Sequence, residues 1–221
     1  MTQLMDWTDR IVEGDCIRVL KTMPAASVDL VVTDPPYLVR YRARDVRRIA
    51  NDDNADWLAP AFAEVSRVLK RDRFCISFYG WGHTDRFLAA WRAAGLRPVG
   101  HFVFAKSYYS EARFVRYRHE CAYLLAKGEP PPPSIALPDV LDWCYSGDAL
   151  HPTQKPLLSM LPLVLTYSRQ GDLVLDPFAG SGTTALAAKL LNRRYLGIEL
   201  DPRYARLARE RLARCDVGES R

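Results

Sequence analysis

Short runs rich in β-branched and aromatic residues alternate with segments of helical periodicity along most of this chain. In one such segment Leu58, Phe62, Val65 and Leu69 recur on a single helical face. Strands that alternate with helices predict a mostly parallel sheet with helices on both faces. The seven runs that we expect to be strands are 10–12, 28–33, 74–79, 98–104, 121–126, 172–175 and 195–200.

Local signals refine this α/β prediction. Asp56 is placed to cap the helix that begins near Leu58, and Asp201 can cap a helix that has Pro202 as its first residue. Runs 98–104 and 121–126 have no good helix between them, which favours an antiparallel pair at one edge of the sheet. We find no internal repeat, and we expect residues 1–221 to form a single domain.

Composition narrows the function without deciding it. The chain has 25 Arg and 6 Lys and a net charge of +5. This excess is typical of a protein with a polyanionic partner, although a GC-rich genome would also supply arginine codons. Five scattered cysteines indicate neither a disulfide framework nor a metal site. No signal peptide is apparent, and the longest apolar stretch, 157–167, is too short to span a membrane, so we expect a cytoplasmic protein.

The first motif with chemical content follows the run 28–33. Asp34-Pro35-Pro36-Tyr37 places a carboxylate, two rigid backbone units and an aromatic ring at the carboxyl end of a strand, where ligands bind in open α/β sheets. The prolines remove two N–H donors, so hydrogen-bond acceptors dominate this corner, and such a cluster can hold an amino group. An ordinary strand-terminating turn is the alternative.

The second motif runs from Asp176 to Thr184 and leads into a helical segment. Gly180 and Gly182 permit a tight turn, while hydroxyl groups and a helix N-terminus offer donors to a carboxylate. Glu199 follows 17 residues after Gly182, where it could accept hydrogen bonds from a ribose. The dinucleotide pattern G-x-G-x-x-G fails at Ala185, and no phosphate-binding Gly-Lys-Ser/Thr is present. A generic glycine turn is the alternative.

Together these motifs resemble the bacterial DNA amino-methyltransferases that produce N6-methyladenine or N4-methylcytosine. The order, with DPPY before DPFAGSGTT, is similar to that of their permuted β group. The likeness extends to Gly14-Asp15-Cys16, His119-Glu120 and the HPTQKP segment 151–156, and so covers nearly the whole chain. It implies a Rossmann-like sheet of seven strands, mostly parallel with one antiparallel strand and helices on both faces. It also implies S-adenosylmethionine as the cofactor.

The resemblance assigns roles residue by residue. Catalysis would fall to Asp34, Pro35, Pro36 and Tyr37. Glu199 would take the ribose hydroxyls, Lys155 the cofactor carboxylate, and Asp15 with the Cys16 backbone the adenine edge, although Asp15 could also cap a helix. His119 and His151 would be structural. The cofactor set is Asp15, Cys16, Lys155, Asp176, Phe178, Gly180, Ser181, Gly182, Thr183 and Glu199.

In the mechanism that follows, Asp34 and the Pro35 carbonyl accept the two N–H bonds of a base amine and aim its lone pair at the methyl group. The base must be flipped out of the duplex, with Tyr37 stacking on it. Segments 38–54, 106–118 and 128–150 could contact DNA and read its sequence, or be solvated surface loops. The expected DNA-binding residues are Arg40, Arg42, Arg44, Arg47, Arg48, Tyr108, Tyr109, Arg113, Arg116 and Arg118.

Aspartate at the first motif position favours N6 of adenine over N4 of cytosine. A methyltransferase acting on RNA or on a protein amide, and a regulator that binds DNA without catalysis, are the remaining alternatives. We expect a homodimer, because a compact monomer covers few base pairs. Protection against a partner nuclease and control of gene expression both fit this reading.

Overall fold

The computed structural model describes residues 7–39, 52–111, 114–144 and 154–218. Within these ranges, one eight-stranded sheet has the order β1-β8-β7-β2-β3-β5-β4-β6. Neighbouring strands run parallel, except that β5 is antiparallel to both β3 and β4. The strands are β1 (Arg10–Glu13), β2 (Val28–Thr33), β3 (Leu69–Phe78), β4 (Arg97–Glu111), β5 (Arg116–Lys127), β6 (Val140–Asp142), β7 (Leu173–Asp176) and β8 (Arg194–Glu199).

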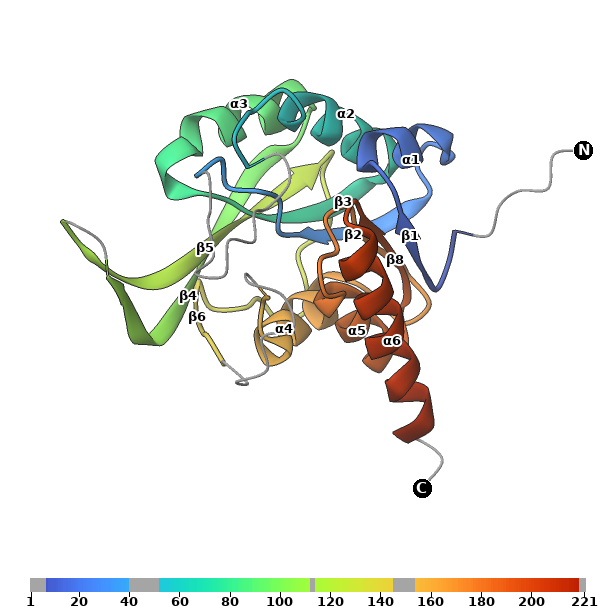
Figure 1. Ribbon diagram of the computed structural model, residues 1–221. Helices are drawn as coiled ribbons and strands as arrows, with labels where there is room; N and C mark the ends of the chain where they lie inside the picture. Colours follow the sequence, from blue (N-terminus) through green and yellow to red (C-terminus); the bar gives the residue numbers. More distant parts are fainter. Residues whose placement is uncertain (1–6, 40–51, 112–113, 145–153, 219–221) are drawn as a thin grey trace, which may run out of the picture.

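Helices cover both faces of the sheet (Figure 1). The helices α1 (Cys16–Thr22), α2 (Leu58–Val68) and α3 (Thr84–Ala93) pack on one face, and a short 3₁₀ helix (Trp81–His83) precedes α3. The other face carries α4 (Leu157–Tyr167), α5 (Thr183–Leu190) and α6 (Pro202–Gly218). Each face has its own buried core, one centred on Phe62 and Trp91 and the other on Phe78 and Leu163. This arrangement confirms the α/β prediction.

All seven runs expected from the sequence are strands, and β6 adds an eighth at the edge beside β4. We expected the segment 128–150 to contact DNA or to be a solvated surface loop, and its residues Val140–Asp142 pair with β4. The apolar stretch 157–167 is the helix α4, with Pro162 inside it. A proline in a helix interior removes one backbone hydrogen bond, so the sequence pattern favoured no helix there. No helix among the described residues is both long and apolar enough to cross a membrane.

Two of the three expected helix caps are present. Asp15 accepts a hydrogen bond from the backbone N–H of Arg18 at 2.9 Å at the start of α1, and Asp201 accepts one from Arg203 at 2.8 Å at the start of α6. The expectation for Asp56 was wrong, because Trp57 occupies the cap position of α2 and no side-chain cap bond forms there. The side chain of Asn54 accepts the backbone N–H of Asp56 at 3.2 Å, so a local turn precedes the helix.

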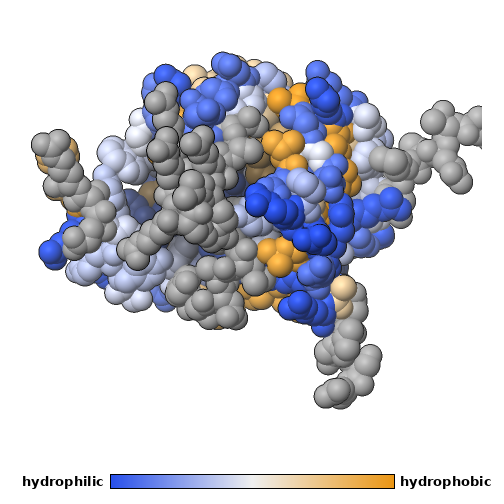
Figure 2. All heavy atoms as spheres, viewed as in Figure 1, coloured by the Kyte–Doolittle hydropathy of each residue, from blue (hydrophilic) through white to orange (hydrophobic). Residues whose placement is uncertain are grey.

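The predicted antiparallel pair of β4 and β5 is confirmed, and it extends into a two-stranded ribbon. Pairing continues to Glu111 opposite Arg116, beyond the part of β5 that lies beside β3. The ribbon projects from one edge of the sheet, at the left of Figure 1. Figure 2, in the same view, shows hydrophilic residues over much of α6.

Candidate functional site

The strands β2 and β7 lie side by side and parallel, with Val31 opposite Leu175. After β2 the chain proceeds to α2 on one face of the sheet, whereas after β7 it proceeds to α5 on the other. The carboxyl ends of two such strands border a crevice, which is the usual ligand site of an open α/β sheet. Thr33 at the end of β2 donates its hydroxyl to Asp176 Oδ1 across this crevice at 2.8 Å.

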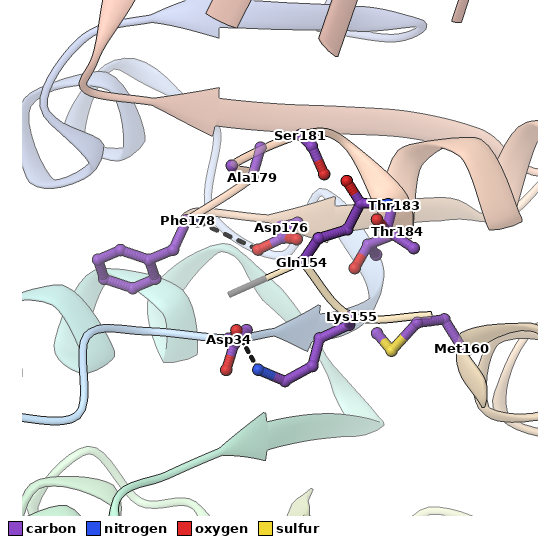
Figure 3. A pocket seen from close by; sticks show the side chains of 11 residues that line it. Asp34, Gln154, Lys155, Met160, Asp176, Phe178, Ala179, Ser181, Thr183 and Thr184 are labelled. Carbon is purple, nitrogen blue, oxygen red and sulfur yellow. Dashed lines mark hydrogen bonds and ion pairs between the residues drawn. The ribbon is translucent and has the colours of Figure 1, made fainter. Parts of the chain in front are cut away.

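The two sequence motifs line one pocket at this point (Figure 3). Asp34 enters from the end of β2, and the loop between β7 and α5 forms the opposite wall. The methyl-transfer hypothesis required these two corners to lie together, and in the structure they do. The lining residues are Asp34, Gln154, Lys155, Met160, Asp176, Phe178, Ala179, Gly180, Ser181, Thr183 and Thr184.

Glu199 supports the glycine loop. Gly180 and Gly182 have φ angles of 51° and 77°, in the region that favours glycine. The backbone N–H of Gly180 donates to Glu199 Oε2 at 2.7 Å, and that of Asp201 donates to Oε1 at 2.8 Å. Burial raises the pKa of Glu199, whereas these two bonds lower it. Glu199 therefore ties the end of β8 to the loop, a role that the ribose expectation did not include.

A partly buried cation lies behind the hydroxyl groups of the loop. Arg211 on α6 donates from one guanidinium nitrogen to Ser181 Oγ at 3.3 Å and to Thr183 Oγ1 at 2.9 Å. A hydroxyl oxygen that accepts a bond from an arginine keeps its own proton for a further partner. Both hydroxyls can therefore donate into the pocket that they line. No pattern near Arg211 in the sequence pointed to this contact.

Asp176 holds the start of the loop from inside the protein. Its Oδ1 accepts bonds from the Thr33 hydroxyl and from the backbone N–H of Phe178, the latter at 3.1 Å. Burial raises the pKa of Asp176 to about 7. These contacts fix the loop to the strand that ends at Asp34, so Asp176 joins the two walls of the pocket.

Lys155 contacts Asp34 in this pocket, which the expected contact with the cofactor carboxylate did not include. The Lys155 ammonium, itself buried, forms an ion pair with Oδ2 of the partly buried Asp34. The other oxygen, Oδ1, is buried and has no hydrogen-bond partner among the described residues. Burial raises the pKa of Asp34, and the charge of Lys155 acts in the opposite direction. The spacing of 121 residues between the partners gave no local signal for this pair.

A second, partly buried ion pair adjoins Tyr37, and no sequence pattern pointed to it. Lys106 Nζ lies 2.5 Å from Glu120 Oε1, and the Tyr37 hydroxyl donates to Glu120 Oε2 at 3.4 Å. Burial alone would raise the pKa of Glu120, but Lys155 and Lys106 outweigh it and the pKa falls below its usual value. Burial and the charges of Asp34 and Glu120 hold the pKa of Tyr37 well above its usual value, so its phenol is neutral.

Gly80 after β3 allows the DPPY segment to pack closely on the sheet. A Cβ atom at Gly80 would lie 2.6 Å from the Tyr37 carbonyl oxygen and 2.8 Å from the Tyr37 Cβ. Real Cβ atoms do not approach other atoms so closely, so only glycine fits without moving Tyr37. The position of Tyr37 thus depends on a residue that no motif singled out.

The remaining expected residues divide into three groups. Cys16 is buried, and burial raises the pKa of its thiol to about 12, so it stays protonated. Exposed positions on the β4–β5 ribbon are occupied by Tyr108, Tyr109, Arg116 and Arg118, and the two arginines lie over the Tyr109 ring at 6.0 and 5.2 Å. Outside the described residues lie Arg40, Arg42, Arg44, Arg47, Arg48, Arg113 and His151.

Comparison with known proteins gives a consistent result. The family model described as a DNA methylase, which covers N6 and N4 enzymes, matches residues 28–140 and 136–210. The protein YubD of Escherichia coli (strain K12), named as a methylase, is 54% identical over 204 residues, which cover 92% of this chain and 90% of YubD. The DNA adenine methyltransferase YhdJ of the same organism is 30% identical, covering 91% of this chain and 82% of YhdJ.

Solved structures of DNA methyltransferases share this fold, one of them a cytosine-N4 enzyme, whereas the relative YhdJ is named as an adenine enzyme. The DNA modification methylase TTHA0409 of Thermus thermophilus, in complex with S-adenosyl-L-methionine, is 31% identical with a TM-score of 0.72, and the match covers 93% of each chain. The cytosine-N4-specific PvuII DNA methyltransferase has a TM-score of 0.76 at 21% identity, covering 91% of this chain and 85% of that enzyme. The fold alone therefore does not distinguish the two target bases.

Proposed function

Because this chain belongs to the N6/N4 family of DNA methylases, we propose that it transfers the methyl group of S-adenosylmethionine to the N6 amino group of adenine in duplex DNA. One observation carries the proposal. Asp34, with its buried and unpartnered Oδ1, lines the same pocket as the glycine loop. An acceptor without a partner can bind an amine. A turn rich in donors across the pocket can hold a cofactor by its carboxylate, so the two can react.

The loop residues fit S-adenosylmethionine. The hydroxyls of Ser181 and Thr183, set by Arg211, and the N-terminus of α5 can donate to the methionine carboxylate. Glu199 ends β8, and Asp15 and Cys16 follow the neighbouring strand β1. We propose that Glu199 holds the ribose and that Asp15 and the Cys16 backbone hold the adenine. When bound, the cofactor supplies an electrophilic methyl group on a sulfonium.

The rest of the chemistry is proposed for the chain's own residues. A base amine is a weak nucleophile, because its lone pair is delocalised into the ring. Asp34 Oδ1 and the Pro35 carbonyl accept the two N–H bonds and direct the lone pair toward the pocket. Positioning and acceptor electrostatics then provide most of the acceleration. The target base reaches Asp34 only after it is flipped out of the duplex, and the neutral ring of Tyr37 offers it a stacking surface.

We propose adenine as the target because Asp34 opens the motif and because the relative YhdJ is named as an adenine enzyme. The test is transfer of labelled methyl to duplex DNA, single-stranded RNA and protein, followed by separation of the nucleosides. N6-methyladenine in DNA is the expected product. N4-methylcytosine would establish the cytosine alternative, label in RNA or protein would replace the DNA proposal, and binding of DNA without any turnover would indicate a regulator.

The β4–β5 ribbon is proposed to contact DNA together with segments 38–54 and 128–150. Two-stranded ribbons fit the major groove of DNA. On this ribbon Arg116 and Arg118 lie over the ring of Tyr109, and such pairs of cations and rings are typical of nucleic-acid contacts. A homodimer remains part of this proposal, because one compact chain covers few base pairs.

Replacing both Arg116 and Arg118 by alanine should weaken DNA binding by a similar factor for every sequence. The slope of log affinity against log salt should fall by about one for each lost phosphate contact. Titrations at several salt concentrations measure this slope. The matched control replaces Arg206 and Arg214, which are exposed on α6. An unchanged slope in the ribbon variant would mean that the ribbon does not touch the backbone.

A further inference from the structure

Lys155 lies in an enclosed, mostly aromatic environment. Its side chain is only 7% exposed, and the ammonium lies 5.0 Å from the ring centroid of Phe78, 5.3 Å from that of Tyr37 and 6.0 Å from that of Trp143. Rings at these distances attract a cation through their negative faces. The three rings come from β3, from the DPPY segment and from the residue after β6, so distant parts of the chain hold this ammonium in place.

The two oxygens of Asp34 have different environments. Oδ2 bonds to the Lys155 ammonium, whereas Oδ1 is buried without a hydrogen-bond partner among the described residues. A buried acceptor without a partner is costly and rare in proteins, and it marks a position where a partner is missing. Because Lys155 engages only one oxygen, the second is held in a defined direction and remains available.

Resting on the proposed function, we propose that Lys155 is a positioning residue for methyl transfer: it holds Asp34 through Oδ2 and leaves Oδ1 to accept the N–H of the target amine. This assignment differs from the expected role, in which Lys155 binds the cofactor carboxylate. In this proposal the groups that donate to the cofactor carboxylate are the hydroxyls of Ser181 and Thr183, which Arg211 orients.

The pair also controls the charge of Asp34. The titratable groups that face it are Lys155 from the segment before α4, Tyr37 from its own loop, Glu120 from β5 and Asp176 from β7. Lys106 faces it indirectly, through Glu120. Of these groups, Lys155 alone makes an ion pair with Asp34 among the described residues. Without that cation, burial and the charge of Glu120 would raise the pKa of Asp34 further, and only the Tyr37 hydroxyl would still lower it.

Substitution Lys155→Met keeps much of the side-chain volume and removes the charge. In this variant Asp34 loses its defined orientation and its pKa is expected to rise, so kcat at pH 7 should fall by about 100-fold. Activity should recover as the pH is raised, because deprotonation restores the acceptor. The affinity for S-adenosylmethionine, measured by calorimetry, should change by less than about 3-fold.

The matched control is Lys70→Met. Lys70 pairs with Asp29 at 2.7 Å, at the opposite end of the same strand β2. This substitution removes the charge of a more exposed lysine, far from the pocket, and Asp29 keeps Arg73 as a partner at 3.6 Å. Its pH profile and its cofactor affinity should match those of the wild type, so a general loss of stability can be separated from the positioning effect.

A second readout does not require activity. Titration of the Asp34 carboxyl by carbon-13 NMR in the full-length protein should show a higher midpoint in Lys155→Met than in the wild type. Equal midpoints would overturn the proposal, and so would a large loss of cofactor affinity with an unchanged pH profile, which would assign Lys155 to the cofactor carboxylate. If the wild type transfers no methyl group to DNA, the proposed function fails. The NMR titration still decides whether Lys155 lowers the pKa of Asp34.

Discussion

Replacing Asp34 by alanine is expected to reduce methyl transfer to DNA by about 10²–10³-fold, because the acceptor that directs the amine is lost. Binding of S-adenosylmethionine should be retained, since the glycine loop that would hold it is fixed by other contacts, such as the bond from Gly180 to Glu199. Single-turnover rates, together with calorimetric affinity for the cofactor, measure the two effects separately. Near-normal turnover in this variant would remove Asp34 from the mechanism.

Folding of the Asp34→Ala protein needs its own control. The substitution leaves Lys155 buried without its partner, which costs about 3–5 kcal/mol in other proteins. Asp34→Asn keeps an acceptor oxygen at nearly the same position and adds no volume. It should retain more activity than the alanine variant, and the double variant Asp34→Ala with Lys155→Met should regain stability without regaining activity.

Replacing Gly182 by alanine is expected to weaken cofactor binding by at least about 10-fold, since the loop must move to make room for the alanine side chain. Gly182 has a φ angle of 77°, and a Cβ there would lie 3.0 Å from the Ala208 Cβ on α6. A shift away from α6 would also disturb the contacts of Arg211 with Ser181 and Thr183. Calorimetry with S-adenosylmethionine measures the loss.

Gly171→Ala provides a control that is matched in backbone strain. Gly171 has a φ angle of 81°, but a Cβ there would meet no atom within 4 Å. Both variants should therefore lose about 1 kcal/mol of stability from backbone strain, and only Gly182→Ala should lose cofactor affinity. Equal affinity in the two variants would show that the close packing of the loop on α6 is not required.

The sequence predicted the scaffold well because buried strands and amphipathic helices carry local patterns. The run 28–33 is wholly buried, and its apolar character is visible without any knowledge of its neighbours. Shorter or interrupted elements were missed for the same reason. Strand β6 has only three residues, with Val140 exposed, and Pro162 interrupts the pattern of α4.

The site was predictable only where its residues are contiguous. DPPY and the glycine loop each form a compact motif, and their juxtaposition followed from the expected sheet. The contacts that orient them join residues far apart in the chain: Lys155 with Asp34, Lys106 with Glu120, and Arg211 with Thr183. No spacing rule relates such positions, so their roles emerge only from the folded structure.

The strand order also bears on how the protein is made. Strands β7 and β8 fill the middle of the sheet between β1 and β2, yet they are the last strands to be synthesised. While the ribosome is still translating residues 173–199, β1 and β2 have open edges and part of each core lacks its cover. Such long-range closure is slow and leaves apolar surface accessible. Nascent chains of this protein are therefore expected to engage chaperones until β7 and β8 have emerged from the ribosome.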